Sequence, residues 1–250
     1  MKLVKFIVIC FIFISIAISC YCLILIIKDM KEEETNESDL IELEKTIIEE
    51  KKEKEDNKII DWNELKSINE DVVAWIVIEN TPVNYPILKD SNNLYYLKHN
   101  FNKKYNSNGS IFTLNKDFIQ DDEVIIYGHN MRNKIMFSIL GNYLNTNFLK
   151  EHQIIKIYTE NKNYIATIFS CYSIGADEES NNIRKLNYEG RISYYKSKSN
   201  IDTKNIDDTG KIIKLSTCSY INAKTTPTDQ RYYVIAMMKE VEWKRYLKRN

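Results

Sequence analysis

Three side chains from distant parts of the sequence carry the groups that nucleophilic catalysis needs. Cys218 ends the run Lys211–Cys218, His129 lies within Tyr127-Gly128-His129-Asn130-Met131, and Arg231 opens a later apolar run. The thiolate is the reactive form of cysteine, so a nucleophilic cysteine needs a proton acceptor or a cation beside it in space. A guanidinium could in addition bind a carbonyl oxygen or an oxyanion without losing its proton. The pattern therefore indicates cysteine chemistry on a carbonyl group.

The thiol and the imidazole both follow short runs that are typical of β-strands. Lys211–Thr217 alternates apolar and polar residues, and this alternation predicts a strand that delivers Cys218 to a loop. Val124–Tyr127 predicts a second strand, which ends just before His129. Gly128 allows a backbone bend or a close approach at that point. Strand ends of this kind are common positions for catalytic groups.

No metal, cofactor or nucleic-acid site is predicted. The sequence has no C-x-x-C or H-E-x-x-H motif, and its six glycines form no phosphate-binding loop. His99 and His152 have polar and charged neighbours that indicate surface positions. No basic block is interleaved with aromatic residues, so binding of nucleic acid is not expected.

The N-terminus predicts a membrane anchor. Phe6–Ile27 holds 22 residues without a charged side chain, enough to cross a bilayer as a helix. Lys2 and Lys5 precede it, whereas residues 31–57 contain 12 acidic residues and 5 lysines, a net charge of −7. This asymmetry favours a cytoplasmic N-terminus and an extracellular C-terminal domain in a single-pass protein of the cell membrane. A cleaved signal peptide would have a shorter apolar core and a small-residue cleavage site, and neither is present.

The segment after the anchor is charged and has two interpretations. Leu40, Leu43 and Ile47 form a narrow helical stripe, which would suit a stalk, but so polar a segment could equally be a disordered spacer. The predicted division is a cytoplasmic N-terminus at 1–5, an anchor at 6–27, a juxtamembrane connector at 28–57 and an extracellular catalytic domain at 58–250.

The C-terminal domain is predicted to be mainly β. Asp61 begins an N-capped short helix, after which β-rich runs alternate with turn residues. Eight strands are predicted, at Ala74–Ile78, Val83–Leu88, Gly109–Thr113, Glu123–Tyr127, Ile154–Thr159, Tyr164–Ser173, Lys211–Thr217 and Tyr232–Met238. Helical patterns at Asn92–His99, Met136–Glu151 and Tyr188–Lys198 are too few for a doubly wound sheet. The expected fold is an eight-stranded β-barrel with a few inserted helices.

The cysteines leave a non-enzymatic alternative open. Three of the five lie in or beside the apolar span, so only Cys171 and Cys218 belong to the domain. In an oxidising exterior these two could form one disulfide. With Cys218 bridged in this way, or simply buried, the chain would be an extracellular binding or scaffold module in which His129 and Arg231 have structural roles.

Three segments together resemble the sortases, which are membrane-anchored transpeptidases of Gram-positive bacteria. The segments are Tyr127-Gly128-His129-Asn130-Met131, Leu215-Ser216-Thr217-Cys218 and Arg231-Tyr232-Tyr233-Val234. The resemblance covers residues 62 to about 240. Further segments resemble class B sortases in particular, namely Trp75, Asn84-Tyr85-Pro86, Asn92-Asn93-Leu94-Tyr95-Tyr96-Leu97 and Gly109-Ser110-Ile111-Phe112. One departure is the polar loop Ile221–Gln230, which is longer than is usual in the family and separates Cys218 from Arg231 by 13 positions.

The resemblance implies a catalytic group of Cys218 as nucleophile, His129 as acid/base and Arg231 as the residue that steadies substrate or oxyanion. Ser216, Asn93 and Leu97 resemble substrate-binding positions, the last two by sharing a helix face at i,i+4. The implied partners are secreted proteins with a C-terminal sorting motif, cleaved after threonine, and a peptidoglycan peptide amine that resolves the thioacyl link. No cofactor is needed. A membrane-tethered cysteine peptidase that hydrolyses its acyl-enzyme is the alternative within the same chemistry.

Overall fold

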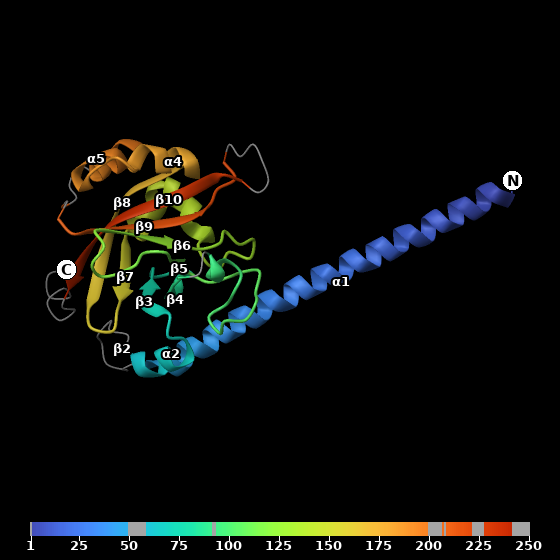
Figure 1. The fold of residues 1–250 in the computed structure, drawn as a ribbon, viewed down its shortest axis with the longest axis horizontal. Coiled ribbons are helices and arrows are strands. Elements are labelled where there is room, and N and C mark those ends of the chain that lie inside the picture. Colours follow the sequence, from blue (N-terminus) through green and yellow to red (C-terminus); the bar gives the residue numbers. More distant parts are fainter. Residues whose placement is uncertain are drawn as a thin grey trace. The chain divides into compact units, whose positions relative to one another are not determined.

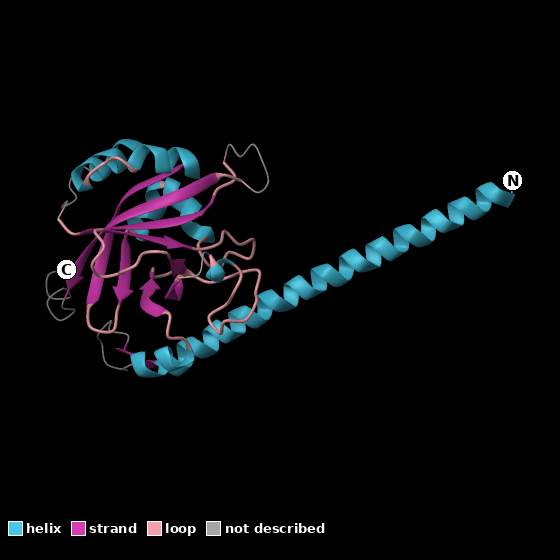
Figure 2. Cartoon of the chain, viewed as in Figure 1, coloured by secondary structure: helices cyan, strands magenta, loops and turns pink. Residues whose placement is uncertain are grey.

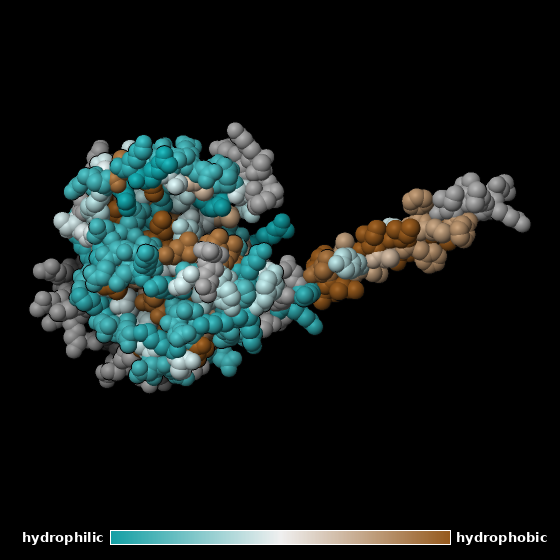
Figure 3. All heavy atoms as spheres, in the orientation of Figure 1, coloured by the Kyte–Doolittle hydropathy of each residue, from teal (hydrophilic) through white to brown (hydrophobic). Residues whose placement is uncertain are grey.

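The computed structural model describes residues 2–49, 59–91, 94–199, 207, 209–221 and 228–241. The chain divides into two compact units, Met1–Glu44 and Lys45–Asn250. The first consists of most of helix α1, Lys2–Ile47. Within it, Ile9–Lys28 is long and apolar enough to cross a membrane, and none of that window is buried. Figure 3 shows the hydrophobic residues along this helix. The helix extends to Ile47, so the first part of the charged connector is helical.

The second unit is built on a closed barrel of eight strands, as the sequence predicted (Figure 1). The strand order is β10-β8-β7-β3-β4-β5-β6-β9. Neighbours pair antiparallel except β4 with β5 and β6 with β9, which are parallel. The strands are β3 Val72–Val77, β4 Asn84–Lys89, β5 Phe112–Thr113, β6 Glu123–Tyr127, β7 Ile154–Tyr158, β8 Asn163–Gly175, β9 Lys211–Cys218 and β10 Gln230–Val241. A separate two-stranded sheet pairs β1 Ile48–Glu49 with β2 Ile59–Ile60.

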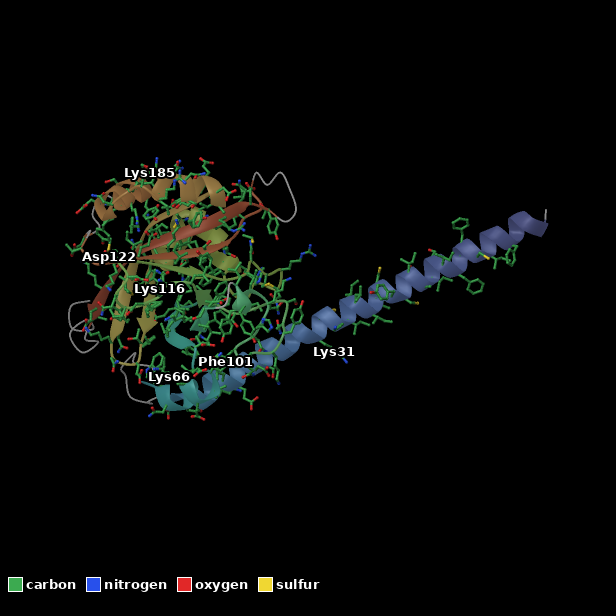
Figure 4. The ribbon with its side chains drawn as sticks, viewed as in Figure 1. Lys31, Lys66, Phe101, Lys116, Asp122 and Lys185 are labelled. Carbon is green, nitrogen blue, oxygen red and sulfur yellow. The ribbon has the colours of Figure 1, made fainter. Side chains whose placement is uncertain are left out.

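Two of the expected helices are found where the sequence placed them. Helix α2, Trp62–Ile68, begins after Asp61, whose carboxylate accepts from the backbone N–H groups of Asn63 and Glu64. Helix α5, Tyr188–Lys198, has the predicted bounds. Both of these helices lie outside the barrel (Figure 2). Lys185, in the turn before α5, and Lys66 of α2 lie on opposite sides of it (Figure 4).

The other helical predictions need correction. Asn92–His99 was expected to be a helix, but its described part holds only the 3-10 turn η1, Tyr95–Leu97, because Leu94 takes a left-handed backbone conformation with φ of 71°. Met136–Glu151 divides into the 3-10 helix η2, Ser138–Leu144, and the short helix α3, Thr146–Glu151. Asn145 ends the first and caps the second with its side chain.

One helix, α4 at Ala176–Ile183, was not predicted. It follows β8 directly and is followed by α5, and the two lie along one side of the barrel beside β8 and β10 (Figure 1). Beneath them an apolar cluster joins the helix residues Ile192 and Tyr195 to Ile212 of β9 and Tyr233 of β10. Because side chains alternate along a strand, Ile213 and Leu215 of β9 face the barrel interior, and both are fully buried.

Candidate active site

Strand pairing brings the candidate nucleophile and the candidate cation together. In the antiparallel ladder of β9 and β10, Cys218 is the direct partner of Arg231. Directly opposed residues on antiparallel strands have Cβ atoms about 4.5 to 5.5 Å apart. The connection of 12 residues between them therefore does not displace the arginine. Part of that connection, residues 222–227, lies outside the described residues.

The imidazole approaches from the other side of β9. Strand β6 runs parallel to β9 with Tyr127 opposite Ser216, and the ladder ends where Gly128 donates its N–H to the Ser216 carbonyl at 3.2 Å. A Cβ on Gly128 would lie 2.4 Å from Ile111 Cδ1 and 2.8 Å from the Phe137 ring. The glycine is therefore required for a close approach, one of the two roles expected of it. His129 follows at the same rim as Cys218.

The histidine is held by a main-chain carbonyl. His129 Nε2 lies 2.8 Å from the Leu97 carbonyl oxygen, which can only accept, so Nε2 carries a proton. Nδ1 is then the ring nitrogen left to take up or release a proton. The contact also ties the candidate acid/base to η1, whose Leu97 side chain lines the same cleft. Leu97 was expected from the resemblance, but this role of its backbone was not.

Asn130 is a site residue that sequence reasoning missed. Its side-chain Nδ2 donates to the Cys218 carbonyl oxygen at 2.8 Å, which joins the loop after β6 to the end of β9. It lies next to His129 in the sequence, and this adjacency is the signal that could have identified it. The bond fixes the backbone from which the thiol projects.

Arg231 is oriented by the chain beside it. One guanidinium nitrogen, Nη1, donates to the carbonyl oxygens of Thr228 at 2.8 Å and Gln230 at 2.9 Å. An arginine has five N–H donors, so most of its hydrogen-bonding capacity stays available to a ligand. The side chain is half-buried and lines the cleft with Cys218 and His129.

These groups line one cleft of about 440 Å³ on the outer face of β6, β9 and β10. Its volume lies in the usual range for a small-molecule or peptide side-chain site. Leu97 and Ser216, two predicted substrate-binding residues, are part of its lining. The third, Asn93, lies outside the described residues, and the left-handed conformation of Leu94 removes the α-helical spacing on which its prediction depended. Apolar side chains around the cleft are Leu94, Leu114, Phe112, Ile125 and Ile183.

The two cysteines of the barrel have different environments. Cys218 is half-buried at the cleft, whereas Cys171 on β8 is buried. Burial raises the pKa of the Cys171 thiol well above its usual value, which makes it unreactive. Both are free thiols, so the expected alternative of a Cys171–Cys218 disulfide does not describe this structure.

Two charged residues at the inner end of the cleft were also missed. Glu179 of α4 and Lys214 of β9 line the cleft and form an ion pair with side chains only 3% and 2% exposed. Burial lowers the pKa of Lys214, and the nearby Glu179 carboxylate opposes that effect. No sequence pattern indicates this pair, because the partners are 35 positions apart and belong to a strand and an unpredicted helix.

The fold and the cleft define a β-barrel protein with a thiol, an imidazole and a guanidinium on one rim. A sortase domain family model matches residues 76–239, and the chain belongs to the sortase family. It is 36% identical over 162 residues to Sortase B of Listeria monocytogenes, a match that covers 62% of this chain and 65% of that relative. Identity to Sortase B of Staphylococcus aureus is 30% over 188 residues, which cover 72% of this chain and 75% of the relative. These relatives make it a class B sortase.

Solved structures agree with this assignment. The chain is similar to sortase B of Clostridium perfringens, with a TM-score of 0.63 and 31% identity over 72% of this chain and 99% of that one. A Staphylococcus aureus sortase B–substrate complex gives a TM-score of 0.63 and 30% identity over 72% of this chain and 85% of that one. The family is one of cysteine transpeptidases, and the match spans the strands that carry His129, Cys218 and Arg231.

Proposed function

We propose that the chain is a cysteine transpeptidase that cleaves a C-terminal sorting motif of secreted proteins after its threonine and joins the new end to a cell-wall peptide amine. The observation that carries the proposal is the direct pairing of Cys218 with Arg231 at the rim where His129 also lies. Each of the three can then act on one peptide carbonyl. Because the chain belongs to the sortase family, transfer rather than hydrolysis is the expected outcome.

In the acylation half, His129 holds the proton of the Cys218 thiol, and the thiolate attacks the carbonyl carbon of the threonine at the scissile bond. A C–S bond forms, and the carbonyl electron pair moves to oxygen, where Arg231 stabilises the negative charge. When the tetrahedral intermediate collapses, the C–N bond breaks and the leaving amine takes a proton from His129. The product is a thioester on Cys218.

In the transfer half, an amine takes the place of the departed segment. Its nitrogen attacks the thioester carbon and gives a proton to His129, and the Cys218 thiolate leaves as the new amide forms. The thioester retains the acyl group in activated form, so a positioned amine competes with water. The half-buried position of Cys218 and the apolar lining limit access of bulk water.

The proposed location follows from the N-terminal helix. Ile9–Lys28 would anchor the protein in the cell membrane, with residues 1–5 cytoplasmic and the acidic side of the span outside. In this arrangement residues 58–250 form an extracellular catalytic domain. Both proposed partners are also found outside the cell membrane. The connector at 28–57 would join the anchor to the catalytic domain.

The test is product analysis with the full chain in detergent. A library of peptides with an internal threonine is supplied with or without triglycine as the amine. We expect a ligated product that requires both triglycine and Cys218. Release of free acid alone in the presence of triglycine would favour the hydrolytic peptidase, and no cleavage of any peptide would refute the proposed chemistry.

A further inference from the structure

The outer face of β9 changes from buried to open along its length. Ile212, Lys214, Ser216 and Cys218 lie on this face because strand side chains alternate. Ile212 belongs to the apolar cluster under α4 and α5, whereas Ser216 and Cys218 line the cleft. Lys214 lies at the boundary, and its side chain with that of Glu179 closes the inner end of the cleft.

The two charges are satisfied entirely by protein groups. The Lys214 ammonium donates to Glu179 Oε1 and lies 4.4 Å from the Tyr233 ring centre and 5.0 Å from that of Tyr195. Tyr172 donates its hydroxyl to Glu179 Oε1 at 2.6 Å, and Tyr194 donates to Oε2 at 2.9 Å. The carboxylate therefore has a donor from each of three elements, β8, α5 and β9.

Besides Glu179, helix α4 is attached at its two ends: the Ala176 N–H donates to the Asp229 carbonyl at 2.9 Å, and Ile183 packs against the apolar cluster. All of its residues are described, and Glu179 is the one that is buried, while Ile183 is half-buried. Its N-cap residue is Gly175, which supplies no side-chain hydrogen bond. Yet α4 forms one wall of the cleft, through Ala176, Ser180 and Ile183 as well as Glu179. Between these two ends, Glu179 is the buried residue that joins the wall to the barrel.

Stability alone does not require an ion pair at this position. Two buried charges lose their hydration, and a well-packed apolar pair of similar volume often stabilises a protein equally or more. An apolar pair would not fix the orientation of the helix, because apolar contact is non-directional. A carboxylate hydrogen-bonded to fixed donors does fix it.

We propose that Glu179 and Lys214 are positioning residues that hold α4 as a wall of the cleft, so that a bound sorting peptide lies with its scissile carbonyl at Cys218. The inference rests on the proposed function and extends it from the reacting groups to the substrate-binding wall. The pair acts through α4, so it affects binding of the peptide and not the reactivity of the thiol.

The decisive variant replaces both charges at once, Glu179→Leu with Lys214→Met, in the full chain in detergent. We expect it to fold, although the buried Tyr172 hydroxyl loses its acceptor, and to react with a small methanethiosulfonate reagent at the wild-type rate. The KM for the sorting peptide rises at least about tenfold while kcat changes less than about threefold, because uniform binding has been lost. Glu178→Gln is the matched control, since Glu178 is an exposed neighbour on α4; its KM stays at the wild-type value.

The outcomes separate the two proposals. A wild-type KM in a folded double variant would overturn the positioning role alone. Failure of the wild-type protein to turn over any sorting peptide would refute the proposed function and this inference together. If the double variant does not fold, Tyr194→Phe removes one donor to Glu179 from a half-buried position. It should raise KM about two- to fourfold with unchanged thiol labelling, and an unchanged KM in that variant would also overturn the inference.

Discussion

The outer face of β9 has a covered half, Ile212 and Lys214 beneath α4 and α5, and an open half, Ser216 and Cys218 at the cleft. The two halves differ in which groups hydrogen-bond to the polar side chains around them. In the covered half, Lys214 and Glu179 are bound by side chains, including the hydroxyls of Tyr172 and Tyr194. In the open half, the catalytic candidates are bound by main-chain carbonyls, as in the contact of His129 with Leu97. The comparison shows how one strand face can serve as both core and reactive surface, according to whether α4 and α5 cover it.

The physical reason lies in the hydrogen-bonding capacity that remains. Main-chain carbonyls bind one ring nitrogen of His129 and one guanidinium nitrogen of Arg231, which leaves the other nitrogens to a ligand. Glu179 and Lys214 do not need to leave a donor or acceptor to a ligand. They need full pairing with protein groups, because an unpaired buried charge is strongly unfavourable. Substitutions in the open half should therefore affect rate, and substitutions in the covered half should affect stability or the position of α4.

The largest effect is expected for Cys218→Ala. Transpeptidation should fall by about four orders of magnitude or more, because the nucleophile is lost. The free energy of unfolding should change by less than about 0.5 kcal/mol, since the side chain is half-buried and packs little. Ligated product by mass spectrometry and chemical denaturation measure the two quantities. In the matched variant Cys171→Ala, we expect the reverse, namely a loss of about 1 kcal/mol and retained activity; activity lost equally in both would contradict the distinction.

Lys214→Ala tests the covered half in the same way. It leaves the Glu179 carboxylate buried without its counter-ion, and loss of one partner of such a pair costs about 3 to 5 kcal/mol. Urea denaturation monitored by circular dichroism measures it. Ser216→Ala, two residues along the same face, should cost less than about 1 kcal/mol. Equal losses in both variants would show that the two halves are not energetically distinct.

The sequence predicted the parts of this comparison that depend on local pattern. Short β-rich runs bounded by turn residues identified all eight barrel strands, and Cys218, His129 and Arg231 lie at the ends of runs that the barrel then joins. The roles of these residues and the limits of the catalytic domain stay predictions. The class of fold was predictable because buried strands repeat with period two.

The covered half was not predictable, for a physical reason. Helix α4 has the sequence Ala-Asp-Glu-Glu-Ser-Asn-Asn-Ile, which has no apolar stripe to mark it as a packed helix. It is attached by Glu179, whose partner lies 35 positions away. Lys214 looked like the polar side of an alternating strand, and only the covering helices make that position interior. Polar contacts between distant elements leave no periodic signal.

Gly128→Ala should have an intermediate effect in the open half. The new Cβ would overlap Ile111 and the Phe137 ring, and overpacking of this kind costs about 1 to 3 kcal/mol. The displaced backbone also carries His129, so kcat/KM should fall at least about tenfold. Gly175→Ala is the control, because its nearest contacts are the ends of the Asp229 and Gln230 side chains at 3.3 and 3.4 Å. A Gly128→Ala enzyme with wild-type stability and rate would contradict the close approach.

Asn130→Ala should have a smaller effect on the same loop. Loss of its hydrogen bond to the Cys218 carbonyl removes about 1 kcal/mol, which corresponds to about fivefold in kcat/KM if the bond acts on the thiol position. Asn130→Asp should be no better, because a carboxylate cannot donate to a carbonyl oxygen. Steady-state kinetics of both variants with one peptide measures this. Full activity in Asn130→Asp would show that donation to Cys218 is not what the residue contributes.

The tyrosines of the covered half should have the smallest effect on stability at neutral pH. Their ionisation at high pH distinguishes the covered half from the open half. Burial raises the pKa of Tyr172, Tyr195 and Tyr233, and burial with the nearby Glu179 carboxylate raises that of Tyr194 to about 12. Above the ordinary value of 10.0, the unfolded chain loses phenolic protons that the folded protein keeps, so stability falls as pH rises.

The lowered pKa of Lys214 acts in the opposite direction, because the unfolded chain keeps a proton that the folded protein releases more easily. The lysine effect falls below its ordinary pKa of 10.5, where stability rises with pH, whereas the four tyrosines lower stability above pH 10.0. Stability should therefore rise toward about pH 10 and fall above it. Denaturation midpoints measured against pH, with tyrosinate absorbance recorded in parallel, provide the test. Buried tyrosines should ionise only as the protein unfolds. Ionisation of all tyrosines near pH 10.0 in a protein that keeps its circular dichroism would contradict the raised pKa values of the buried tyrosines in the covered half.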